Sequence, residues 1–157
     1  LHVRSRRQRQ MCIRDRYYTN TNQTFAFASG TVTASYGTAT AQAIADTLFT
    51  AQDETDGLGT EGEVKTRGLK YTHKEVINSQ AAGILQDTDW MVIRAAEGGT
   101  AVPGATTTWR AAVRTKANSM QAQIDGAANV DALAALYVYN DSTPPVRPLG
   151  EFPILGE

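Results

Sequence analysis

The chain has 157 residues, with 15 basic and 16 acidic side chains, a formal net charge of −1 and one cysteine. This length suits one modest domain or two small modules. No run of about 18 apolar residues occurs, which excludes a membrane-spanning helix. A single cysteine excludes a disulfide framework and zinc sites built from several thiolates.

Residues 6–16, RRQRQMCIRDR, hold much of the basic charge and the only cysteine, Cys12. Written back into codons, this run resembles a transposase adapter used to prepare DNA sequencing libraries. A basic nucleic-acid-binding arm and a mitochondrial-type presequence are the alternatives. We interpret residues 1–16 as an artefact that packs against nothing, and expect the genuine chain to begin near Tyr17. The remainder has 9 basic and 15 acidic residues, and its charge of −6 argues against binding to nucleic acid or anionic membranes.

Residues 23–36, QTFAFASGTVTASY, alternate apolar with small or polar side chains around a Ser-Gly turn. This pattern predicts a β-hairpin whose two-residue loop sets Phe27 opposite Val32 and Phe25 opposite Ala34. A lone hairpin is marginal in water, so we expect a short helix over about 41–49 to cover the apolar face. Together these elements predict a ββα module over residues 17–50.

Residues 51–71 are rich in glycine and acidic side chains and predict a linker, or a short strand around 63–66. The linker superficially resembles a calcium-binding loop in the positions of Gln52, Glu54, Asp56, Gly57 and Glu63. The first position of such a loop requires aspartate and here is glutamine, and the flanking helices do not suit it. A solvated acidic loop is therefore the favoured interpretation. The glycines do not form a phosphate loop, because no Gly-Lys-Ser/Thr follows and the acidic groups would repel phosphate.

The strongest helical pattern begins near Thr72 and opens a helical module over residues 72–138. One helix face is formed by Ile77, Ala81, Ile84 and Leu85. Thr88 either begins a new turn or continues this helix, with Thr88 or Asp89 as a cap. Gly98-Gly99 should end the helix, since glycine readily adopts the backbone conformation found just past a helix end.

A second helix should follow, capped within Thr106–Thr108 and ending at Asp125-Gly126. Its buried stripe is formed by Trp109, Val113, Ala117, Met120 and Ile124. Joined by a short Gly/Pro connection, the two helices should pack as an antiparallel hairpin. We expect Trp90 and Trp109 to pack in the core across it, the alternative being interface anchors. A last short helix should be capped by Asp131.

Four of the five prolines lie in residues 139–157, which should run extended and dock on this domain or on a partner. The expected class is therefore α+β: a β-hairpin with a short helix, an antiparallel helical hairpin and an extended Pro-rich tail.

The catalytic inventory is nearly empty. Beyond residue 16, His73 is the only histidine, and its place in a first helical turn favours a solvated or capping role. No cysteine partner and no Gly-x-Ser-x-Gly motif accompany it. We therefore expect no enzyme, and no catalytic, cofactor-binding or metal-binding residues.

Residues 85–114, LQDTDWMVIRAAEGGTAVPGATTTWRAAVR, resemble a block found in small proteins of tailed bacteriophages of the tail-fibre assembly or tail assembly chaperone type. The match covers about a third of the chain beyond residue 16 and does not include the predicted ββα module. It is carried by Thr88, Asp89, Trp90, Arg94, Glu97, Gly99, Pro103, Trp109, Arg110 and Arg114. From the residues alone, Arg94 and Glu97 form a pair on the helix surface, and Arg110 and Arg114 are surface side chains.

This resemblance implies a phage assembly factor that binds other tail or tail-fibre proteins. Association with further copies of the same chain, as a homo-oligomer, is a second option. Such a protein would act in the bacterial host cytoplasm during assembly. The alternative is a minor structural component retained in the virion. A small enzyme or a calcium-binding protein is the remote alternative.

Overall fold

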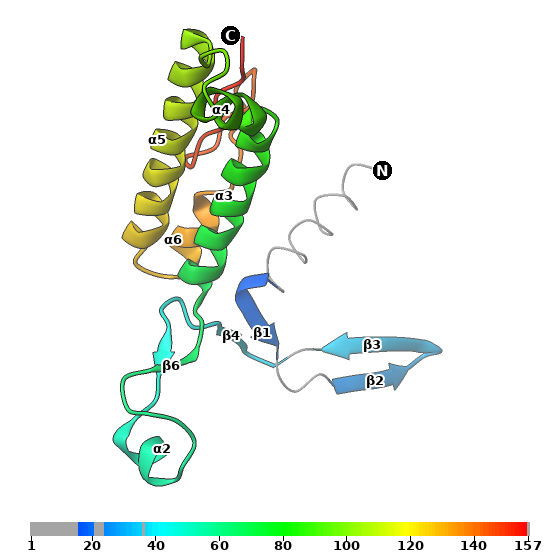
Figure 1. Cartoon of the computed structure of the whole chain (residues 1–157). Coiled ribbons are helices and arrows are strands. Elements are labelled where there is room, and N and C mark those ends of the chain that lie inside the picture. Colours follow the sequence, from blue (N-terminus) through cyan, green and yellow to red (C-terminus); the bar gives the residue numbers. More distant parts are fainter. Residues whose placement is uncertain (1–15, 21–23, 36, 157) are drawn as a thin grey trace. The chain divides into compact units, whose positions relative to one another are not determined.

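The computed structural model describes residues 16–20, 24–35 and 37–156, so most of the predicted artefact lies outside the described residues. The protein is of the mixed α+β class (Figure 1). It divides into two compact units, residues 1–69 and residues 70–157. None of the helices described is both long and apolar enough to cross a membrane.

The described residues of the first unit form three separate two-stranded antiparallel pairs. They are β1 (Tyr18–Asn20) with β4 (Ala39–Ala41), β2 (Thr24–Ala28) with β3 (Thr31–Ser35), and β5 (Thr47–Leu48) with β6 (Val64–Thr66).

The predicted hairpin register is confirmed in the β2–β3 pair, where Phe27 faces Val32 and Phe25 faces Ala34. Ser29 and Gly30 form the loop with φ values of 53° and 75°. Positive φ at both loop positions is the geometry of a type I′ turn, whose twist matches that of the flanking strands.

The helix expected over residues 41–49 is not present, so the ββα prediction is wrong. Long-range contacts hold this backbone in a non-helical course. The carboxylate of Asp46 accepts hydrogen bonds from the Arg67 side chain and the Gly68 N–H, and the Leu69 N–H donates to the Ala43 carbonyl. These contacts tie residues 43–48 to the strand β6 region and override local helical periodicity.

The predicted linker is instead part of the first unit. Helix α2 (Ala51–Thr55) lies within it and begins with a capping box between Thr50 and Asp53. This Thr-x-x-Asp spacing is the sequence signal for the missed helix. Strand β6 falls inside the predicted 63–66 segment, which confirms that alternative.

The second unit is built from α3 (Leu69–Gln86), α4 (Asp89–Ala96), α5 (Gly104–Gly126) and α6 (Val130–Ala135). Helices α3 and α5 lie side by side and antiparallel (Figure 1). Near one end Lys74 pairs with Asp125, and near the other Arg110 reaches the Leu85 carbonyl.

Several helix boundaries differ from those expected. Helix α3 begins at Leu69, and the chain leaves it before Thr88, so α4 is a separate helix. Helix α5 begins directly after Pro103, ahead of the threonines proposed as caps. Asn129, not Asp131, caps α6 by accepting a hydrogen bond from the Ala132 N–H.

The core of the second unit lies between α3 and α5, closed by α6 and the tail. The α5 stripe is confirmed for Val113, Ala117, Met120 and Ile124, which are buried, whereas Trp109 is only partly covered. On the α3 side Ile77 and Ala81 are buried, as predicted.

The tail docks on its own unit. Residues 139–156 contain no helix or strand, yet Leu149 is fully buried. The Leu149 N–H donates to the Leu136 carbonyl at 3.1 Å, and the Trp109 indole N–H donates to the Pro153 carbonyl at 2.9 Å. Of the two destinations left open by the sequence, the structure shows the intramolecular one.

Candidate functional site

A buried arginine organises the joint between α3 and α4. Arg110 of α5 is 7% exposed, and its guanidinium donates to the Leu85 carbonyl at 2.9 Å, to Thr88 Oγ1 at 2.5 Å and to Asp89 Oδ1 at 2.7 Å. A charge is removed from water at low cost only when it is paired and hydrogen-bonded. The Leu85 carbonyl belongs to the last turn of α3, where carbonyls lack helical partners. Arg110 is therefore not the surface side chain that was expected.

Thr88 is hydrogen-bonded to two other members of this network. Its hydroxyl accepts from Arg110 and donates to the Leu85 carbonyl at 2.9 Å. The side chain makes no capping bond to α4, which corrects its expected role. Asp89 lies in the first turn of α4, where the helix dipole favours a carboxylate.

The two tryptophans do not meet. Trp90 is 53% exposed on α4, while Trp109 contacts the tail through Pro153. The prediction that both pack in the core is therefore wrong for Trp90. The break at Thr88 ends the α3 face before Trp90 and gives α4 its own axis (Figure 1).

The exposed side chains of Trp90 and Ile93, with the partly buried side chain of Arg94 beside them, form a patch that we call the α4 surface. The three positions share one helix face, because residues three and four apart are neighbours on a helix. Ile93 is 58% exposed, and the Arg94 guanidinium lies 4.8 Å from the Trp90 ring centroid. Arg94 thus stacks on Trp90, and the ion pairs of the described residues do not include one between Arg94 and Glu97.

The end of α4 requires glycine. Gly98 has a φ of 83°, as expected just past a helix end, and the Gly99 N–H donates to the Arg94 carbonyl. A β-carbon at Gly99 would lie 2.9 Å from that carbonyl oxygen. Pro103 precedes α5, and Arg114 is exposed on α5. These residues of the block shape or flank the helix connection.

His73 is buried, which corrects the expectation of a solvated or capping side chain. Its Nδ1 lies 2.7 Å from the hydroxyl oxygen of Tyr137, and the two ring centroids are 4.9 Å apart. This contact provides a hydrogen-bond partner for the buried polar ring of His73 inside the second unit. Periodicity could not reveal it, because the partner lies 64 residues away.

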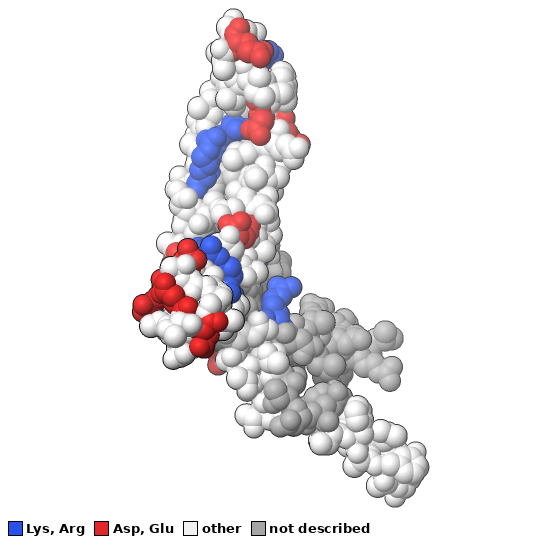
Figure 2. Space-filling view, turned by 60° about the horizontal axis from the view of Figure 1, so that its bottom comes forward, with Lys and Arg blue, Asp and Glu red and all other residues white. Residues whose placement is uncertain are grey.

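The acidic side chains of α2 and of the loop after it lie close together (Figure 2), where they bond to their own neighbours. Glu54 accepts from the Glu61 N–H and Asp56 from the Gln52 amide. Asp53 accepts from Lys65, and this bond, together with those from Thr50, lowers the pKa of its carboxyl to about 2. Within the described ranges no three or more His, Cys, Asp or Glu side chains are grouped to hold a metal ion.

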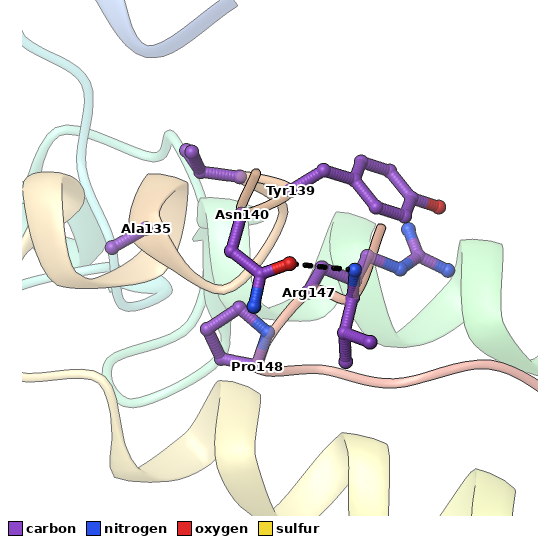
Figure 3. Close-up of a pocket in the computed structure, with 7 residues that line it drawn as sticks. Ala135, Tyr139, Asn140, Arg147 and Pro148 are labelled. Atoms are coloured by element: carbon purple, nitrogen blue, oxygen red, sulfur yellow. Dashed lines mark hydrogen bonds between the residues drawn. The ribbon is translucent and has the colours of Figure 1, made fainter. Parts of the chain in front are cut away.

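An open pocket of about 690 Å³ lies beside α6 and the tail (Figure 3). Its lining consists of Ala135, Val138, Tyr139, Asn140, Val146, Arg147 and Pro148. The polar groups here hold the tail loop together. Asn140 Oδ1 accepts from the Val146 N–H at 2.8 Å, and Arg147 pairs with Glu151 at 2.8 Å. The side-chain oxygen of Asn140 and the guanidinium of Arg147 are therefore bonded within the tail itself.

No family model, curated protein or solved structure matches this chain.

Proposed function

We propose that this is a non-enzymatic protein of a tailed bacteriophage that assists assembly of the tail or tail fibre. It would bind another phage structural protein through the α4 surface, in the bacterial host cytoplasm. The support comes from the resemblance of residues 85–114 to the phage block and from the way the fold divides the residues of that block.

The main support for the proposal is that some residues of the block are buried in a network while others are exposed on α4. Thr88, Asp89 and Arg110 are joined in one hydrogen-bonded network although up to 22 residues separate them in sequence. The same block leaves Trp90 and Ile93 largely exposed on the helix that the network anchors. A helix that is anchored at its first turn and presents a large aromatic side chain to solvent is suited to binding.

The chemistry of the α4 surface agrees with a protein partner. Tryptophan and arginine are the residues most enriched among binding hot spots. Stacking on the Trp90 ring fixes the Arg94 guanidinium before binding, which reduces the entropy lost on association. The partner site should therefore offer an apolar pocket for the indole and an acceptor for the guanidinium.

Co-expression with the tail and tail-fibre proteins of the encoding phage tests the proposal. The tagged chain should retain one of them, and Trp90→Ser should reduce recovery at least about tenfold, the effect of losing a typical hot spot. Val76→Ser is the matched control, since Val76 is 46% exposed on α3, outside the α4 surface. Equal recovery with both variants, or none with the unmodified chain, would contradict the proposal.

Mass spectrometry of purified particles separates an assembly factor from a subunit of the virion. An assembly factor should be absent from mature particles. Stoichiometric recovery there would favour the alternative of a minor virion component.

A further inference from the structure

The β2–β3 hairpin exposes an apolar face. Phe25 and Phe27 lie on the same face of β2, because alternate residues of a strand share a face, and Val32 faces Phe27 from β3. These three side chains are 67%, 75% and 63% exposed. A two-stranded hairpin is at best marginally stable alone, whereas three or more strands with a covered apolar face are stable.

The outer edge of β2 has unpaired backbone groups. Among the described residues, β2 pairs only with β3. In an antiparallel hairpin with a two-residue loop, the pair flanking the loop is hydrogen-bonded and such pairs alternate along the strands. Ala28 and Ala26 therefore bond towards β3. The peptide groups of Phe25 and Phe27 face the free edge.

Charge favours a second copy as the partner at this edge. The sequence from Tyr17 to Ala45 contains no Asp, Glu, Lys or Arg. Charged side chains on edge strands normally prevent pairing with other chains. Without them, two copies of the hairpin meet with no like-charge repulsion, and a strongly charged partner would gain nothing from this edge.

The strand is also self-complementary in sequence. Residues 24–28 read TFAFA, which is nearly the same in both directions. Antiparallel pairing around a twofold axis at Ala26 sets Phe25 of each copy opposite Phe27 of the other. That register uses the free peptide groups of Phe25 and Phe27 and makes two aromatic cross-strand pairs. Strand β3 reads similarly as TVTAS, but its smaller face residues make β2 the better edge.

We propose that β2 of one copy pairs antiparallel with β2 of a second copy around Ala26, forming a four-stranded sheet. The four phenylalanine rings then lie together on one face of that sheet. This contact belongs to the first unit and is independent of the α4 surface, so Trp90→Ser should leave it unchanged.

Sedimentation of the full chain over a wide concentration range tests this pairing. The unmodified protein should form a dimer. Phe25→Glu or Phe27→Lys alone should raise the dimer dissociation constant roughly tenfold or more, because each places two charges opposite phenylalanine rings. Leu58→Lys is the control, since Leu58 is 61% exposed in the same unit outside the hairpin. It should remain dimeric.

Mixing the two charged variants tests the register. A mixed pair sets the introduced glutamate opposite the introduced lysine and leaves one Phe–Phe pair, so dimers should return. An unchanged helical circular dichroism signal shows that the helical unit of the variants is folded, and recovery of dimers in the mixture shows that their hairpins are folded. The proposal is overturned if the unmodified chain stays monomeric, if the single variants remain dimeric, or if the mixture stays monomeric. Binding of a monomer to phosphatidylcholine vesicles in place of self-association would also overturn it.

Discussion

Arg110 Nη2 and Asp89 Oδ1 lie 2.7 Å apart and join α5 to the first turn of α4. The two sides of this ion pair are unequal, because the arginine side chain is 8% exposed and the aspartate side chain 51%. The arginine therefore depends on its acceptors, while water can replace the arginine around the aspartate. Substitution of Arg110 should therefore lower the stability of the protein more than substitution of Asp89.

Replacing Arg110 with alanine should lower the free energy of unfolding by about 2–4 kcal/mol, because it leaves a cavity and removes the donor to Thr88 and the Leu85 carbonyl. Asp89→Asn should cost about 1 kcal/mol or less, since that carboxylate is half exposed. Urea denaturation measures both. Arg114→Ala, on the exposed side of α5, should change stability by less than about 0.5 kcal/mol. A loss for Arg110→Ala no larger than this control would refute the role assigned to the arginine.

Leu149→Ala should cost about 2–5 kcal/mol, because Leu149 is fully buried where the tail meets the helices. Ile154→Ala is the control in the same tail, and at 65% exposure it should be nearly neutral. Denaturant midpoints provide the comparison. Equal midpoints for the two variants would mean that the tail does not contribute to the core.

The Asp53 carboxyl should titrate well below an ordinary aspartate. Hydrogen bonds from Lys65 and Thr50 stabilise its charged form and bring the pKa to about 2. A depressed pKa in the folded state contributes stability above the unfolded-state value of about 4, and this contribution is lost as pH falls from about 4 towards 2. NMR titration of the side-chain carboxyl measures the pKa directly.

The matched variant is Lys65→Met, which removes the first of these donors. It should raise the Asp53 pKa towards the ordinary value, and added salt should weaken the effect of Lys65 in the unmodified chain. An Asp53 pKa near 4 in the unmodified protein would show that the contact with Lys65 is not formed in solution.

A chain that begins at Tyr17 should unfold at the same denaturant concentration as the full chain, within about 0.5 kcal/mol. The reason is the adapter-like sequence of residues 6–16, which we interpret as foreign to the fold. Recovery of the source codons provides an independent check. A clear loss of stability on truncation would show that this segment belongs to the protein.

Local sequence patterns predicted those secondary-structure elements that are determined by interactions between residues close in sequence. The β2–β3 register follows from alternation and a two-residue turn, and the α5 stripe follows from its helical spacing. Helix α2 was also readable from Thr50 and Asp53, but the acidic composition of the segment favoured a loop.

Long-range contacts account for what periodicity could not predict. Residues 43–48 are held in place by contacts with Arg67, Gly68 and β6. No local sequence pattern predicts these contacts. Burial of His73 depends on Tyr137, and burial of Arg110 depends on the break between α3 and α4. The same break left Trp90 exposed, so the predicted distribution of buried and exposed side chains was wrong for both Trp90 and Arg110.

The bond from Trp109 to Pro153 gives the protein a built-in optical signal. Trp109 is partly buried and hydrogen-bonded to the tail, whereas the side chain of Trp90 is about half exposed to solvent. In a Trp90→Phe chain, the remaining indole would emit at longer wavelength and become easier for acrylamide to quench when the tail detaches. Fluorescence could then follow release of the C-terminal segment in real time, without any attached dye.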